Sequence, residues 1–185
     1  CTTSITLPNP FVVHIRDYQD GNYQDTLHMY TLKQFCDTMH VLQQNASKDE
    51  NAMFHFACGL YAMSFHGKCG KAVQYYRHYA DDHPYFVYKQ RKYTFFEKQY
   101  FYAEEASVFF ETLSKNAKQA SIRQKSLWMK AKCYQYQYPT PLEYDLSTDK
   151  PNKDYLSWVT HNNSYLNEFT KKYKGSPFYD SVYNE

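Results

Sequence analysis

The basic residues that follow Glu111 are the first feature of the sequence able to carry chemistry. No acidic residue occurs between Glu111 and Glu143, and six cations fall in this interval: Lys115, Lys118, Arg123, Lys125, Lys130 and Lys132. Because Lys118, Lys125 and Lys132 are seven residues apart, they share a face if one continuous helix carries them. Such a stripe could hold an anionic polymer or nucleic acid by ion pairing and aromatic stacking. An ordinary solvated helix face is the alternative.

A tyrosine-rich segment is the second candidate for binding. Tyr136, Tyr138 and Tyr144 lie in or beside a polar stretch that separates two expected helices. Insertions in a helical array lie on its surface and often carry binding residues. Since a tyrosine offers both a ring and a hydroxyl, these three residues are candidates for contacting a protein or a glycan. A simple connector would explain the segment equally well.

Histidines and carboxylates do not form a recognisable catalytic site. His78 and His83, with Asp81 and Asp82 between them, come closest to a ligand spacing for a divalent metal, but a solvated helix end explains them. The sequence has no nucleophile elbow and no phosphate-binding glycine loop. We therefore expect no catalytic residue, no metal and no cofactor, and we predict that the chain is not an enzyme.

Composition indicates a folded, soluble chain, for which one domain is the default expectation and a helical array is also possible. The chain has 185 residues, a net charge of +2, and aromatic residues at 19%, of which 21 are tyrosines. The charge is too small to indicate nucleic acid by itself, and no apolar run is long enough for a transmembrane segment. The tyrosine excess fits either wide amphipathic seams between helices or a tyrosine-lined recognition surface.

Five widely spaced cysteines show no zinc-binding spacing. Cys58 and Cys69 flank one expected turn and could form a disulfide in an oxidising compartment, but a small buried thiol explains Cys58 as well. The sequence leaves these two alternatives open.

Hydrophobic spacing predicts a succession of amphipathic helices after a broken N-terminal region. Proline and glycine surround one β-like run at 11–15, so residues 1–30 are expected to be an extended lead-in. Thr31 is expected to cap the first helix, and Ser121 a later one. Glycine or proline ends most of the remaining predicted helices, which cover 51–65, 71–82, 85–101, 102–118, 121–138 and 153–174.

Small residues and aromatics recur along these helices at fixed intervals. Ala72, Tyr76 and Pro84 are four and then eight residues apart, and Phe169 and Pro177 repeat the interval of eight. This spacing resembles the tetratricopeptide repeat, in which such residues sit where two helices approach closely. The positions to which the resemblance gives this structural role are Gly59, Ala72, Tyr76, Pro84, Ala106, Phe110, Trp128, Ala131, Phe169 and Pro177.

The resemblance implies an all-α fold, in which antiparallel helix hairpins stack as a tetratricopeptide-like array after the short lead-in. It is degenerate, because Lys118 stands where the middle repeat would have proline. The helical repeat domain is expected to span 31–185, with hairpins at about 51–84, 85–118 and 121–177.

The sequence texture, rich in Tyr, Asn, Lys and Phe, is similar to carboxy-terminal regions of large uncharacterised Bacteroidetes envelope lipoproteins. This second resemblance implies a cell-envelope location, periplasmic or surface-exposed, and no particular activity. Together the two resemblances imply a noncatalytic protein-interaction or assembly module whose partner is another protein. A glycan-binding or glycan-processing surface module remains the alternative, followed by binding of an anionic polymer or nucleic acid.

Overall fold

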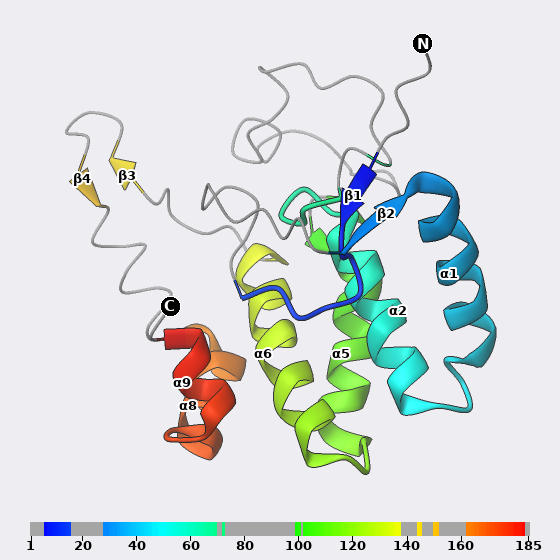
Figure 1. Cartoon of the computed structure of the whole chain (residues 1–185). Helices are drawn as coiled ribbons and strands as arrows, with labels where there is room; N and C mark the ends of the chain where they lie inside the picture. The colour runs from blue at the N-terminus through cyan, green and yellow to red at the C-terminus, as the bar shows by residue number, and fades with distance from the viewer. Residues whose placement is uncertain are drawn as a thin grey trace.

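The computed structural model describes residues 6–15, 28–69, 72, 99–100, 102–137, 144–145, 150–151 and 162–183. Within these ranges the protein is mainly helical, and each helix packs against its neighbours (Figure 1). The helices are α1 (Leu32–Asn45), α2 (Glu50–Ala62), α5 (Glu104–Asn116), α6 (Ala120–Gln137), α8 (Ser164–Tyr173) and α9 (Pro177–Tyr183). None of these described helices is long and apolar enough to cross a membrane.

Two small antiparallel sheets accompany the helices, so the expected all-α fold is only approximately right. One pairs β1 (Thr6–Pro8) with β2 (Met29–Thr31), and the other pairs β3 (Tyr144–Asp145) with β4 (Lys150–Pro151). The protein is therefore a mainly α structure with a two-stranded sheet at its N-terminal end.

The first helix starts as predicted at the cap residue Thr31. Its hydroxyl oxygen accepts a hydrogen bond from the Gln34 amide at 3.2 Å, and the Gln34 side chain accepts one from the Thr31 amide at 2.9 Å. This reciprocal pair satisfies two donors that a helix start would otherwise leave without partners. A short turn then leads to Asp49, which caps α2 by accepting from the Asn51 amide.

The core lies where α2, α5 and α6 meet. Phe54 and Tyr61 of α2 pack with Phe110 and Leu113 of α5 and with Met129 of α6, and all five side chains are buried. Figure 1 shows α1, α2, α5 and α6 side by side, with the α1–α2 and α5–α6 turns at the same end. Helix α2 packs against both α1 and α5, and α6 packs against both α5 and α8, so the described contacts do not test the predicted hairpin boundaries.

The N-terminal region differs from the expected lead-in. The run 11–15 is not a strand, whereas Thr6–Pro8, which contains a proline, pairs with Met29–Thr31. Leu7, Phe11 and His14 are buried against the helices. The region is thus an integral layer of the fold, because the apolar faces of α1 and α2 need a cover that hydrophobic periodicity does not reveal.

The C-terminal region contains a helix that the sequence did not predict. The described part of the expected 153–174 helix is α8, and the chain turns at Gly175, whose φ of +80° suits glycine. Pro177, taken as the end of a repeat, is instead the first residue of α9. Proline is favoured there because it lacks the amide hydrogen that a helix start cannot use, and Ser176 accepts from the Tyr179 amide.

Most of the positions assigned to repeat packing are buried where the structure describes them. Ala106, Phe110, Ala131 and Phe169 are at most 2% exposed. A Cβ atom at Gly59 would overlap Met39 Sδ and touch Phe11, so α1 approaches α2 where no side chain intervenes. Two further repeat positions, Ala72 and Trp128, are partly buried. Tyr76 and Pro84 lie outside the described residues, as do most residues of the expected helices at 71–82 and 85–101.

Cys58 and Cys69 are not bridged. Both thiols are buried, and burial raises the pKa of Cys58 and raises that of Cys69 to about 12. They therefore serve as small apolar side chains, while Cys36 is exposed on α1.

The Thr31 cap yields a stability prediction. Thr31→Ala should lower the free energy of unfolding by about 1 kcal/mol, since the Gln34 amide loses its acceptor. Urea denaturation followed by circular dichroism measures the change. The matched control is Thr112→Ala on α5, whose exposed hydroxyl only donates to the Val108 carbonyl of its own helix. This control should change stability by no more than about 0.5 kcal/mol, and an equal loss in both variants would contradict the capping role.

Candidate interaction site

Residues 9–15, which we call the N-terminal strap, cross from β1 to α6 (Figure 1). The C-terminal end of the strap, at His14 and Ile15, is held by two side chains of α6. Trp128 Nε1 donates to the carbonyl oxygen of His14 at 3.1 Å, and Lys132 Nζ donates to that of Ile15 at 3.0 Å. An extended peptide segment is thus bound through consecutive main-chain carbonyls.

Tyr61 of α2 also contacts this end of the strap, through the ring of His14. The His14 ring lies 5.2 Å from the Tyr61 ring, centroid to centroid, and both residues are buried. We call the surface formed by Tyr61, Trp128 and Lys132 the α2–α6 seam. Val13 packs against the neighbouring core cluster, whereas Val12 points outward and is 45% exposed.

The helical spacing of Trp128 and Lys132 explains why they act together. They are four residues apart, so they project from the same face of α6. Lys132 Nζ also lies 5.5 Å from the Trp128 ring centroid, where the ring attracts the ammonium group. The seam therefore presents two oriented donors at adjacent positions, which suits the backbone of an extended chain.

The strap is fixed at its other end by Phe11. Its ring contacts Tyr30 and Phe35 at centroid distances of 5.2 and 5.7 Å, next to Gly59. The Phe11 amide donates to the Asn9 side chain at 3.0 Å. The two ends of the strap consequently rest on different helix pairs, Phe11 on α1 and α2 and His14 on α2 and α6.

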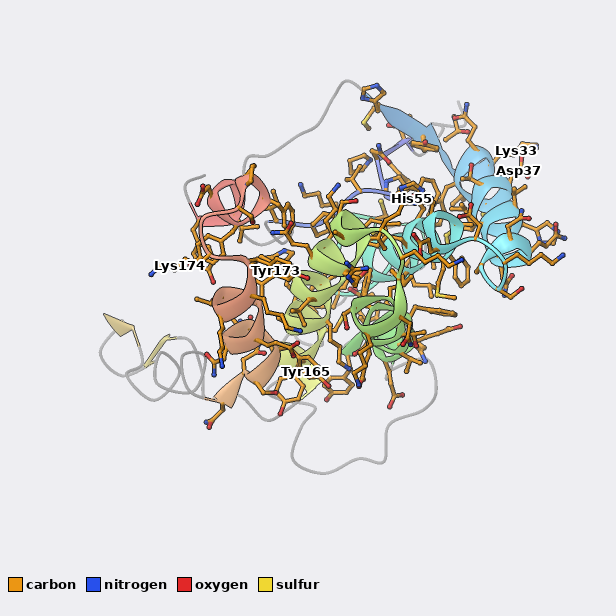
Figure 2. The ribbon with its side chains drawn as sticks, turned by 90° about the horizontal axis from the view of Figure 1, so that it is seen from below. Lys33, Asp37, His55, Tyr165, Tyr173 and Lys174 are labelled. Carbon is orange, nitrogen blue, oxygen red and sulfur yellow. The ribbon has the colours of Figure 1, made fainter. Side chains whose placement is uncertain are left out.

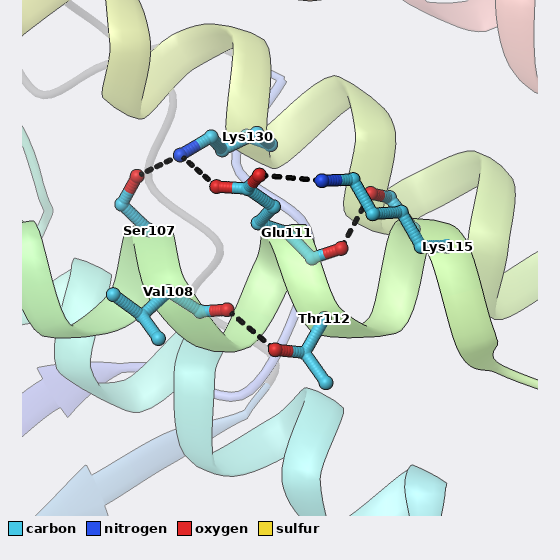
Figure 3. A network of polar contacts seen from close by, with 7 residues as sticks. Ser107, Val108, Glu111, Thr112, Lys115 and Lys130 are labelled. Atoms are coloured by element: carbon cyan, nitrogen blue, oxygen red, sulfur yellow. Dashed lines mark hydrogen bonds and ion pairs between the residues drawn. The ribbon is translucent and has the colours of Figure 1, made fainter.

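A polar network braces α5 against α6 on the other side of α6 (Figure 3). Lys130 is only 6% exposed; its Nζ donates to Ser107 Oγ at 2.9 Å and lies 3.0 Å from Glu111 Oε2. Lys115 pairs with the other carboxylate oxygen at 2.6 Å. The Tyr165 ring of α8 lies 4.9 Å from Lys130 Nζ. Lys130 thus contacts Ser107 and Glu111 of α5 and Tyr165 of α8.

The two lysines shift the titration of Glu111. Hydrogen bonds from Lys115 and then from Lys130 lower the pKa of its carboxyl group to about 2. Because these bonds favour the ionised form, the network is formed throughout the neutral pH range.

The predicted basic stripe is not a single exposed face. Lys118 lies exposed in the turn before α6, Lys125 is half-buried, and Lys132 is buried against the strap. Helix α6 starts at Ala120, so only Lys125 and Lys132 lie on the same helix. Whether Lys118 and Lys125 bind a partner stays a prediction.

The other cations of this interval have local acceptors. Lys115 and Lys130 pair with Glu111, and Arg123 Nη1 donates to the carbonyl oxygens of Ala117 and Lys118. The apparent excess of positive charge is therefore used largely to join helices and to satisfy the end of α5.

Glu50, the first residue of α2, caps the start of α6, a role that the sequence assigned to Ser121. Its two carboxylate oxygens accept from the amides of Lys118 at 2.6 Å and Gln119 at 3.0 Å. Ser121 lies within the first turn of α6 and is exposed. A cavity of about 410 Å³ lies between the α1–α2 and α5–α6 turns around this cap. No local motif could have identified the cap, because Glu50 is 68 residues from Lys118.

The candidate tyrosines are only partly placed. The backbone of Tyr136 belongs to α6 and that of Tyr144 to β3, but their side chains, and all of Tyr138, lie outside the described residues. Their binding role stays a prediction. His78, His83, Asp81 and Asp82 also lie outside, and the described residues contain no group of three potential metal ligands.

Several other tyrosines pack between helices at the C-terminal end. Phe169 of α8 contacts Trp128 at 5.5 Å, and Tyr179 of α9 stacks on Phe169 at 5.8 Å. Figure 2 shows Tyr165 and Tyr173 on α8 and Lys174 directly after its end, with the exposed Lys33–Asp37 pair on α1 at the far side of the stack. In this region aromatic rings form the amphipathic seams that one interpretation of the composition predicted.

The sequence matches no family model, and comparisons with curated proteins and with solved structures give no significant match. The α2–α6 seam, which holds an extended segment through two side-chain donors, is the candidate interaction site.

Glu111→Gln tests the polar network. The folded-state pKa of Glu111, about 2, is below the ordinary value of 4.5, so its ionised form stabilises the fold above pH 4.5. This stabilisation is lost as the pH falls from 4.5 toward 2. We expect the variant to be less stable by about 1–3 kcal/mol at pH 7, and its difference from wild type to shrink across that interval.

Urea denaturation at several pH values provides the measurement. Glu168→Gln is the control, since Glu168 pairs with Lys172 on the exposed face of α8 and such pairs contribute little. A difference for Glu111→Gln that stays constant from pH 7 to pH 2 would refute the role assigned to the network.

Proposed function

We propose that this chain is a noncatalytic protein-interaction or assembly module that binds an extended segment of another protein at the α2–α6 seam. The supporting observation is the pair of hydrogen bonds from Trp128 and Lys132 to consecutive main-chain carbonyls. Peptide-binding domains obtain affinity from such main-chain contacts and specificity from the side-chain sites beside them.

The helix pairs would form a degenerate tetratricopeptide-like array that supports the seam. The burial of Ala106, Phe110, Ala131 and Phe169 is consistent with this proposal. Stacked helix pairs create extended surfaces that bind protein segments in many repeat proteins. The location within a cell-envelope protein is also part of the proposal, and it rests on the texture of the sequence.

Side-chain selectivity would come from the sites that the strap now fills. The Tyr61 ring contacts the His14 ring at a tilted angle, and the core cluster contacts Val13. A partner segment should therefore place an apolar residue and then a flat ring at these positions. A few buried residues, among which aromatics are enriched, contribute most of the binding free energy at protein interfaces.

A labelled peptide with the strap sequence, residues 9–15 with an amide at its end, tests the proposal. The chain should carry Val13→Asp so that its own strap competes less. In this background Lys132→Met should weaken peptide binding about tenfold, the value of one charge-assisted hydrogen bond of about 1.4 kcal/mol. Fluorescence anisotropy gives the dissociation constants.

Lys125→Met is the matched control, because the same substitution is made two turns earlier on α6, at a half-buried residue outside the α2–α6 seam. It should leave the dissociation constant unchanged. Equal losses for both variants, with steep salt dependence, would instead favour the anionic-polymer hypothesis. Absence of peptide binding in the Val13→Asp background would overturn the proposed function.

A further inference from the structure

We infer that a cavity between the end of α2 and the start of α5 binds a lysine side chain of the partner protein. This cavity, which we call the α2–α5 pocket, has a volume of about 210 Å³ and is lined mainly by apolar groups. Its apolar walls include Leu60, Met63, Ala103 and Ala106, and Glu105 contributes a carboxylate. The inference rests on the proposed function only in taking the partner to be a protein, because the pocket is separate from the α2–α6 seam.

Hydrogen bonds hold the walls of the pocket in place. The Phe65 amide donates to the Tyr100 carbonyl oxygen at 2.7 Å, which joins the segment before α5 to the segment after α2. The Gln99 side chain accepts from the Glu105 amide at 2.8 Å and so caps the start of α5. Gln99 and Tyr100 also line the pocket. A cavity fixed in this way does not have to be ordered when a ligand enters it.

The backbone is strained where α5 begins, at a residue of the pocket wall. Ala103 has a φ of +46°, which a residue with a Cβ atom rarely adopts. Its amide donates to the Gln99 carbonyl oxygen at 3.1 Å, and its own carbonyl oxygen accepts from the Ser107 amide at 2.9 Å. Backbone strain of this kind persists only where the surroundings enforce it. The turn at Ala103 therefore sets the direction of α5 and the position of Glu105, two residues later.

The carboxylate of Glu105 is the group in the pocket that selects for charge. Glu105 is half-buried, and its carboxylate has no ion pair or hydrogen bond within the described residues. Other described glutamates have partners: Glu50 accepts from two amides, Glu111 pairs with two lysines, and Glu168 pairs with Lys172. A carboxylate beside apolar walls is stabilised by a cationic hydrogen-bond donor.

The size and lining of the pocket fit a lysine side chain. The cavity is smaller than the roughly 300–1,000 Å³ of sites for drug-sized ligands, so one side chain suits it better than a whole small molecule. A lysine can bury its aliphatic stem against Leu60 and Met63 while its ammonium group reaches Glu105. Arginine fits less well, because its five donors would outnumber the acceptors of a mainly apolar cavity.

Methyl NMR of the full chain, labelled with ¹³C at the methionine methyl groups, tests the inference. The Met63 resonance is assigned by its loss in Met63→Leu, and the probe is lysine blocked at its α-amino and carboxyl groups. The probe should shift the Met63 resonance saturably, whereas its Nε-acetyl derivative, which lacks the charge, should bind more weakly.

Glu105→Gln should weaken binding of blocked lysine about fivefold, near the upper end for a partly exposed ion pair. Glu104→Gln is the matched control, because it removes the same charge from the first turn of α5 at an exposed residue that does not line the pocket. It should leave the dissociation constant unchanged. Equal weakening in both variants, or equal affinity for blocked lysine and its Nε-acetyl derivative, would overturn the inference.

Two further comparisons separate the remaining outcomes. Tighter binding of butylammonium than of blocked lysine would assign the pocket to a free amine and overturn the partner lysine. The peptide of residues 9–15 contains no lysine, so its binding reports on the α2–α6 seam alone. A Met63 resonance that does not respond to blocked lysine would overturn this inference and leave the proposed function intact, whereas loss of peptide binding alone would do the reverse.

Discussion

Burying two ammonium groups on α6 is the constraint that organises this structure. Lys130 and Lys132 are two residues apart, so their side chains leave the helix on nearly opposite sides. A buried cation requires acceptors, and each lysine finds them on a different element: Lys130 on α5 and Lys132 on the strap. Helix α6 is consequently held from both sides, and the relative positions of α5 and the N-terminal residues depend on it.

The aromatic residues complete this arrangement where hydrogen bonds do not reach. Tyr165 of α8 covers the Lys130 ammonium, and Trp128 lies beside Lys132 while its ring contacts Phe169. Asn163, which caps α8, also donates to the Ala131 carbonyl of α6 at 2.9 Å. Aromatic rings and the Asn163 amide therefore join α8 to the same stretch of α6 that holds the strap. The strap and α8 thus pack against the same part of α6.

Helix positions could be predicted because apolar periodicity and caps are local. Thr31 caps α1, and α5 and α6 follow their expected spans closely. The roles of the lysines could not be predicted, because sequence spacing does not show which cations will be buried. Lys130 and Lys132 place charges on the buried sides of α6, which obscures its apolar face. The strap escaped prediction for a related reason: Phe11 and His14 belong to a β-like run, but they are buried by distant helices and do not pair in a sheet.

The cap that Glu50 provides for α6 has a consequence for how the protein folds. Helices α5 and α6 are close in sequence and can pair early, because closing so short a connection costs little entropy. The amides of Lys118 and Gln119, however, gain their carboxylate acceptor only when α2 arrives from far along the chain. Docking of α2 and completion of the α6 start thus form one cooperative step. Local opening of the α1–α2 pair would fray α6 at the end opposite the seam, which couples two distant parts of the molecule.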